Sequence, residues 1–324
     1  MSRDSSNERG KAPRFPALSS LCVAVAYVVL IAVITRYRSV FEFDPDESNN
    51  LIKALLTDRG FALGKDIWTD QPPFFTSLLR TWLTVTGWSV ASARTLVLLF
   101  SGLLVFALQD TLRLLGGWLH GWVAVTLLVV SASYVPLSVS VMIGLPAIAL
   151  LALSIWTLTQ AFVLRTATLS TPAAYLEAKT TEGWKAPWQE HAWHAASGAL
   201  LGLSLTTKLF TAFMAPALVL LVQGRIFAQL RRPSRRAFAL ASTFSASLAL
   251  AGLIGVWPLL AHRTWSGLIE THSSMRASRG EDFDGIDTVS NFIQGDAGLY
   301  ALAALGVIWA IVRKRHLVHL WTCW

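Results

Sequence analysis

A series of long apolar segments constrains the fold of this chain more than any other feature. About 20 apolar residues are needed for a helix to cross the hydrocarbon core of a bilayer, and backbone groups in lipid must be satisfied within the segment. The sequence therefore predicts an all-α fold, a polytopic transmembrane helical bundle of about eight spans. The predicted spans are 17–35, 92–109, 119–137, 144–164, 195–207, 209–223, 238–259 and 298–312.

Composition excludes a water-soluble domain. The chain is 54% hydrophobic and only 14% charged, and its mean hydropathy is +0.52, which is too apolar for a soluble protein of 324 residues. The formal net charge is +8. In a membrane protein an excess of positive charge is explained by orientation in the membrane and by contact with anionic lipid head groups. It therefore does not indicate a nucleic-acid partner. Cys22 and Cys323 lie at opposite ends of the chain, and we expect no disulfide.

Charge distribution predicts the topology, because Lys and Arg in short loops favour the cytoplasmic side. With 1–16 as a basic cytoplasmic segment, the basic block 231–236 is also inside only if 195–223 crosses twice, which we prefer to one long tilted span. A transmembrane domain then covers 17–312, with longer outer loops at 36–91 and 260–297 and both termini inside. The last segment, 313–324, resembles an interrupted further segment rather than a finished tail.

An acidic cluster opens the loop 36–91 and contains the signals of a helix start. Asp44 is a candidate N-cap, Pro45 suits the first helical position, and Glu47 stands where a capping box has its carboxylate. An apolar face follows, and Arg59-Gly60 supplies a stop. The apolar face consists of Leu51, Ile52, Leu55 and Leu56. We predict a helix on the membrane surface here and a second interfacial helix at about 73–87.

The acidic cluster could also take part in catalysis or metal binding. A helix N-terminus favours ionised carboxylates, so Asp46 and Glu47 are expected to be anions. Such a group can accept a proton from a nucleophile or help to coordinate a divalent cation. The alternative interpretation is that the cluster only caps a helix.

Several motifs appear in a characteristic order along residues 18–260. Asp46-Glu47 is followed by Trp68-Thr69-Asp70-Gln71-Pro72-Pro73, and Arg94 opens the second span. Met142-Ile143-Gly144-Leu145-Pro146 enters the fourth span, and Gly198-x-x-x-Gly202-Leu203 leads to Leu205-Thr206-Thr207-Lys208. This arrangement resembles the membrane glycosyltransferases of the GT-C superfamily. The resemblance is closest to the branch of protein O-mannosyltransferases, lipid A aminoarabinose transferases and lipopolysaccharide-core galacturonosyl transferases.

The resemblance implies an enzyme of the bacterial plasma (inner) membrane that acts on the non-cytoplasmic face. Its donor would be a polyprenyl-phosphate sugar, and its acceptor a lipid, a glycan or a protein. Asp46 matches the catalytic carboxylate of the family and is therefore the expected general base. Glu47 would help to position the acceptor or a divalent metal cation, the one cofactor that the resemblance leaves open.

Charge on the departing phosphate must be met by cations. Arg94 and Lys208 are the candidates for this substrate-binding role, because an ionisable side chain at membrane depth is costly unless it is used. The alternatives are a topological anchor for Arg94 and a snorkelling side chain for Lys208. Gln71 stands where many relatives have Lys or His, so its contact with the carrier phosphate would be a neutral hydrogen bond.

Two departures from the family pattern leave alternatives open. No carboxylate lies between Asp110 and Glu177, where some relatives have an acid near the start of the fourth span. We interpret the acidic stretch 281–287 in the other outer loop as a solvated turn. Members of the family also usually have eleven or more spans. An inactive or truncated accessory protein is therefore one alternative, and a lipid or solute transporter is another, although no repeated halves are visible.

Overall fold

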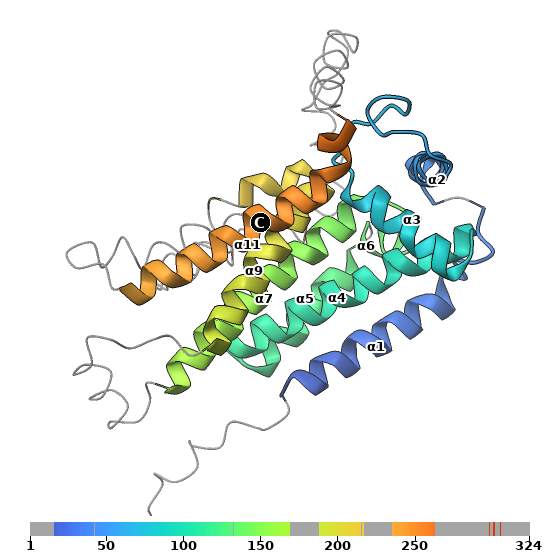
Figure 1. The fold of residues 1–324 in the computed structure, drawn as a ribbon. Helices are drawn as coiled ribbons and strands as arrows, with labels where there is room; N and C mark the ends of the chain where they lie inside the picture. Colours follow the sequence, from blue (N-terminus) through green and yellow to red (C-terminus); the bar gives the residue numbers. More distant parts are fainter. Residues whose placement is uncertain are drawn as a thin grey trace, which may run out of the picture.

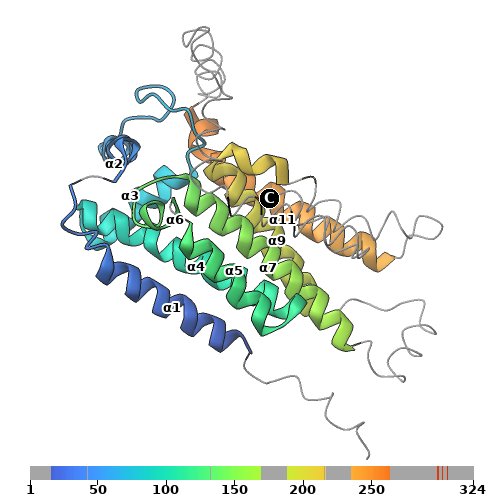
Figure 2. The ribbon, with the colours of Figure 1, turned by 180° about the vertical axis from the view of Figure 1, so that it is seen from behind.

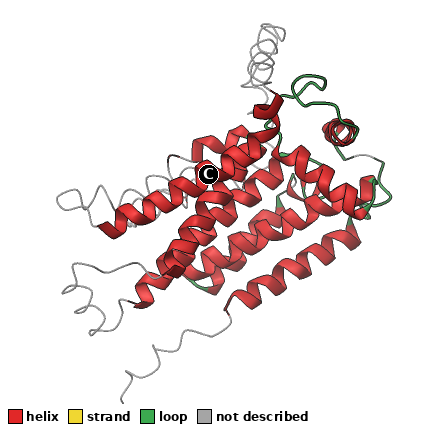
Figure 3. Ribbon diagram, in the orientation of Figure 1, coloured by secondary structure: helices red, strands yellow, loops and turns green. Residues whose placement is uncertain are grey.

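The computed structural model is built from helices. It describes residues 16–41, 43–131, 133–168, 188–214 and 235–262, with the single positions 216, 298, 301 and 305. Within these residues the regular elements are all helical, as Figures 1 and 3 show. The all-α prediction is confirmed for this part of the chain.

Four helices of the described residues are long and apolar enough to cross a membrane, which indicates a membrane protein. They are α1 (Pro16–Ile34), α4 (Val90–Gly116), α7 (Gly144–Thr168) and α11 (Arg235–His262). They match the predicted spans 17–35, 92–109, 144–164 and 238–259. The total of about eight spans stays a prediction, and the last predicted span, 298–312, lies outside the described ranges.

The other predicted spans differ from a single long helix. The segment 119–137 folds as α5 (Trp118–Val130) and the single turn α6 (Tyr134–Leu137), with a break between them. At about 1.5 Å per residue, the 13 residues of α5 are about 20 Å long, which is short of a bilayer core of about 30 Å. The fifth span corresponds to α9 (Trp188–Thr207), and the described start of the sixth is the 3₁₀ helix η1 (Leu209–Met214).

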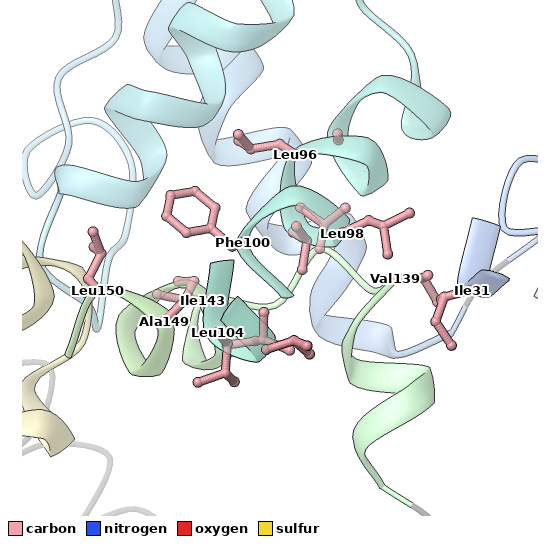
Figure 4. Close-up of a cluster of buried hydrophobic side chains, with 14 of the residues drawn as sticks. Ile31, Leu96, Leu98, Phe100, Leu104, Val139, Ile143, Ala149 and Leu150 are labelled. Carbon is pink, nitrogen blue, oxygen red and sulfur yellow. The ribbon is translucent and has the colours of Figure 1, made fainter. Parts of the chain in front are cut away.

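The long helices pack side by side. Helix α4 contacts α1, α5 and α7, while α9 lies between α7 and α11. Side chains from α1, α4, α7 and the segment before α7 form the main hydrophobic core, part of which Figure 4 shows. Its labelled members include Ile31, Leu98, Val139 and Leu150.

Small residues allow α9 and α11 to approach closely. A Cβ atom added to Gly202 would lie 2.6 Å from the Leu248 carbonyl oxygen, and one added to Gly198 would overlap the backbone at Phe244. The Gly198-x-x-x-Gly202 spacing therefore forms a helix-packing face, as small-residue motifs do in membranes.

A buried carboxylate joins three helices at the end of the bundle where α1 begins and α4 ends. Asp110 of α4 accepts hydrogen bonds from Ser20 of α1 (2.8 Å) and from Trp156 of α7 (2.8 Å). It also pairs with Arg113 at 2.7 Å. The sequence offered no basis for these contacts beyond the presence of an acid in an apolar segment.

Candidate functional site

The predicted site residues lie at the opposite end of the bundle, which we call the α2 end. Helix α2 (Pro45–Asp58) lies there together with α3 (Phe74–Thr86), the first residues of α4 and α7, and the last residues of α9. Asp44 is the N-cap of α2, and its Oδ1 accepts a hydrogen bond from the Asp46 N–H at 2.9 Å. The predicted cap, the proline at the first helical position and the stop at Arg59 are confirmed.

Glu47 and Arg94 form a buried ion pair at the centre of the α2 end. Arg94 Nε donates to Glu47 Oε1 at 2.8 Å, and Arg94 Nη2 donates to Glu47 Oε2. Glu47 is 2% exposed and Arg94 is 1% exposed. Glu47 Oε1 also accepts from the Val141 backbone N–H at 3.1 Å. The expected capping box is therefore wrong, because the Glu47 carboxylate turns away from the Asp44 backbone and into the bundle.

Arg94 has no remaining donor for a substrate. Its Nη1 donates to the carbonyl oxygens of Tyr37 and Val40, both at 2.7 Å, and Nη2 donates to that of Phe41 at 3.2 Å. With the two bonds to Glu47, these bonds use all five N–H groups of the guanidinium. A phosphate-binding role for Arg94 does not fit this geometry. Arg94 instead joins the segment after α1, the start of α2 and α4.

Helix α2 docks on the bundle through a face that combines polar and apolar side chains. Its most buried side chains are Glu47, Asn50, Lys53 and Ala54, whereas Ile52 is 53% exposed. Asn50 Nδ2 donates to the Val141 carbonyl oxygen at 2.8 Å. Glu47 and Asn50 are three residues apart, so both reach the segment before α7 from one helix face. Of the predicted apolar face, Leu51 packs against the main core and Leu55 and Leu56 are partly buried, whereas Ile52 is exposed.

A second ion pair fixes the other half of α2. Lys53 Nζ lies 3.1 Å from Asp70 Oδ1 and 4.7 Å from the centre of the Trp68 ring. Gln71 Nε2 donates to Asp70 Oδ2 at 3.0 Å. Burial raises the pKa of Asp70, but the hydrogen bond from Gln71 and the charge and hydrogen bond of Lys53 outweigh it, so the pKa lies below its ordinary value. Gln71 thus orients an acid in this structure.

Lys208, which follows the last residue of α9, lies beside the start of α7. Its Nζ is 3.9 Å from the position that a Cβ atom on Gly144 would occupy and 5.6 Å from the centre of the Phe210 ring. Among the residues that the structure describes, no carboxylate forms a salt bridge with Lys208. The first backbone N–H groups of a helix lack intrahelical partners and carry partial positive charge. An ammonium group beside them favours an anion at this position.

The segment 141–144 connects the two parts of the α2 end. The Val141 carbonyl oxygen accepts a hydrogen bond from Asn50, and the Val141 N–H donates one to Glu47. Gly144 lies beside the Lys208 ammonium group. Three residues of chain extend at most about 11 Å, so Lys208 lies close to the docked face of α2. Asp46 occupies the first turn of α2 beside Glu47, but its side chain is exposed. The structure thus brings Glu47 and Arg94 into contact and gives Asp46 and Lys208 separate environments at the same end.

No family model, curated protein or solved structure matches this chain. The described residues contain no group of three or more His, Cys, Asp or Glu side chains that could hold a metal ion. Of the expected pair, Glu47 is already bound by Arg94 and Val141, so Asp46 and Glu47 do not fit a divalent cation.

Sequence reasoning missed the residues that hold α2 in place. Asn50 and Lys53 continue the helical spacing of Glu47, at three and six residues beyond it. That periodicity places the three side chains on one helix face, but a polar face normally points to solvent, so the sequence did not reveal that this one is buried. Tyr37 gave no such signal. It supplies a carbonyl oxygen to Arg94, and its hydroxyl lies 2.9 Å from Thr95 Oγ1.

Proposed function

We propose that this protein is a membrane glycosyltransferase that transfers a sugar from a polyprenyl-phosphate donor to a lipid, glycan or protein acceptor. The proposal rests on the resemblance of the sequence motifs to the GT-C superfamily. One structural observation carries it further. Asp46 is an exposed carboxylate on a helix turn whose neighbours, Asp44 and Glu47, are both held by hydrogen bonds.

Such an arrangement suits a general base. Asp46 is fixed by its backbone in the first turn of α2, while its side chain stays open to an acceptor. The Glu47–Arg94 pair holds that turn against α4 without using the Asp46 carboxylate. Positioned proton acceptors of this kind contribute about 10²- to 10⁴-fold to a rate.

The reaction would be a single displacement at the anomeric carbon. Asp46 accepts the proton of the acceptor hydroxyl or amine as the new bond to the sugar forms. The bond between the sugar and the phosphate oxygen breaks, and the polyprenyl phosphate leaves with the electron pair. In this proposal Lys208, whose Nζ lies beside Gly144, and the first N–H groups of α7 stabilise that anion. Arg94 acts as a positioning residue.

The test compares Asp46→Asn with Asp58→Asn in membranes that contain polyprenyl-linked sugars. Asp58 is an exposed carboxylate at the other end of the same helix and serves as the control. We expect Asp46→Asn to reduce sugar transfer at least 100-fold, the lower range for a lost general base, with unchanged membrane insertion and thermal unfolding. Asp58→Asn is expected to keep full transfer. Full transfer by Asp46→Asn would refute the assignment of the base.

Lys208→Gln tests the leaving-group site separately. Removing this ammonium should lower transfer while the Glu47–Arg94 pair keeps the fold, because Lys208 forms no described ion pair that would be lost. Mass spectrometry of polyprenyl-linked sugars would show whether the donor accumulates. Equal transfer by Lys208→Gln and the wild type would remove Lys208 from the proposed site.

A further inference from the structure

An apolar groove lies on the side of the bundle between α1 and α5, and none of its lining residues belongs to the proposed reaction. It encloses about 460 Å³. Helix α1 contributes Cys22, Ala26 and Leu30, and α5 contributes Trp122, Val125 and Val129. Both helices pack on α4, and Figure 2 shows the three helices from behind.

The groove has a defined depth in the membrane. Leu30 lies about 6 Å and Cys22 about 18 Å from the end of α1 at Ile34, at 1.5 Å per residue. One leaflet of the hydrocarbon core is about 15 Å thick. The groove therefore lies largely within the leaflet on the side of the α2 end, at the depth where lipid hydrocarbon chains run.

Two basic side chains stand just beyond the end of α1 that is nearest to Leu30. The helix ends at Ile34, and Arg36 and Arg38 follow it, both exposed. Neither forms a salt bridge with a carboxylate in the described part of the chain. Arg38 donates from Nε to the Tyr37 hydroxyl at 3.4 Å and lies 5.8 Å from the centre of that ring, and no described hydrogen bond uses its two NH₂ groups. Cations at head-group level attract anionic lipids.

We propose that the groove binds one anionic phospholipid of the surrounding bilayer. One hydrocarbon chain fills the space between α1 and α5, and the phosphate of the head group meets Arg36 and Arg38. The apolar lining, its depth within one leaflet and the charge at its end all match a molecule with this chemistry. The site is separate from the proposed transfer reaction and does not depend on it.

The test measures lipid binding to the purified full chain in detergent by native mass spectrometry. Phosphatidylglycerol and phosphatidylcholine are titrated separately. We expect one phosphatidylglycerol to bind more tightly than phosphatidylcholine. The double variant Arg36→Ala with Arg38→Ala should lose that preference, by about fivefold for each arginine, which corresponds to about 1 kcal/mol per basic residue near a lipid surface.

A pair of tryptophan variants on α1 tests the groove itself. Ala26→Trp places an indole ring in the groove, whereas Val25→Trp places one on a part of α1 that is 55% exposed and does not line it. We expect Ala26→Trp to abolish binding of the lipid and Val25→Trp to retain it. Val129→Trp fills the groove from α5 and serves in place of Ala26→Trp if circular dichroism shows that the latter does not fold.

Three results would overturn the proposal. One is equal lipid binding by the filled and control variants. Another is equal affinity for phosphatidylglycerol and phosphatidylcholine in the wild type. The third is a wild-type dimer that Ala26→Trp dissociates, since a second copy of the chain would then occupy the groove.

Discussion

Arg94 and Glu47 lie 47 residues apart in the chain and meet in a buried two-pronged ion pair. The pair connects the first turn of α2 to the first turns of α4, and Arg94 also holds the backbone that follows α1. A guanidinium with every donor used is a rigid connection rather than a ligand site. The position of Asp46, one residue before Glu47, depends on it.

Removing Arg94 should destabilise the protein strongly. Arg94→Met leaves the Glu47 carboxylate buried without its partner, which typically costs about 3–5 kcal/mol. Thermal unfolding in detergent measures the loss. Arg59→Met changes an exposed arginine at the end of α2 and should leave the midpoint nearly unchanged. Adding Glu47→Leu to Arg94→Met should restore part of the stability, and a further decrease would contradict a simple ion pair.

Asp70 should make the attachment of α2 depend on pH. Its pKa in the folded protein is lowered, so its contribution to stability is present above the ordinary value of 3.8 and is lost as pH falls through the folded pKa. Asp70→Asn should therefore lower the unfolding midpoint at pH 7 and lose this effect as pH falls below the lowered pKa of Asp70, where the wild-type carboxyl is also protonated. A difference that stays constant across this range would argue against the Lys53–Asp70 pair as its cause.

Gly202 and Gly252 form a matched test of the contact between α9 and α11. A Cβ atom on Gly202 would meet the Leu248 backbone at 2.6 Å, whereas one on Gly252 meets no atom within 4 Å. Gly202→Ala should cost about 1–3 kcal/mol through overpacking. Gly252→Ala should be neutral or stabilise by up to about 1 kcal/mol, because alanine favours the helix. Equal effects of both changes in thermal unfolding would contradict the close helix contact.

Much of the helical content follows from the sequence. The apolar segments at 17–35 and 144–164 predicted α1 and α7, because uninterrupted apolar residues at this length favour a spanning helix. The start of α2 could also be predicted from the sequence, since Asp44 and Pro45 act through contacts within a few residues. The break in 119–137 was missed, although Ser131, Ser133 and Pro136 are local signals of a helix end and a new start.

The sequence by itself thus determined local structure: which segments are helical, where α2 begins and ends, and that acids gather in its first turn. Only the tertiary structure decided how those acids are used. Glu47 pairs with Arg94, Asn50 binds the backbone before α7, and Asp46 stays exposed. The physical reason is the sequence separation over which each interaction acts. Caps and helical periodicity depend on neighbours within a few residues, whereas the choice between a capping carboxylate and a buried ion pair depends on what the packed helices bring alongside.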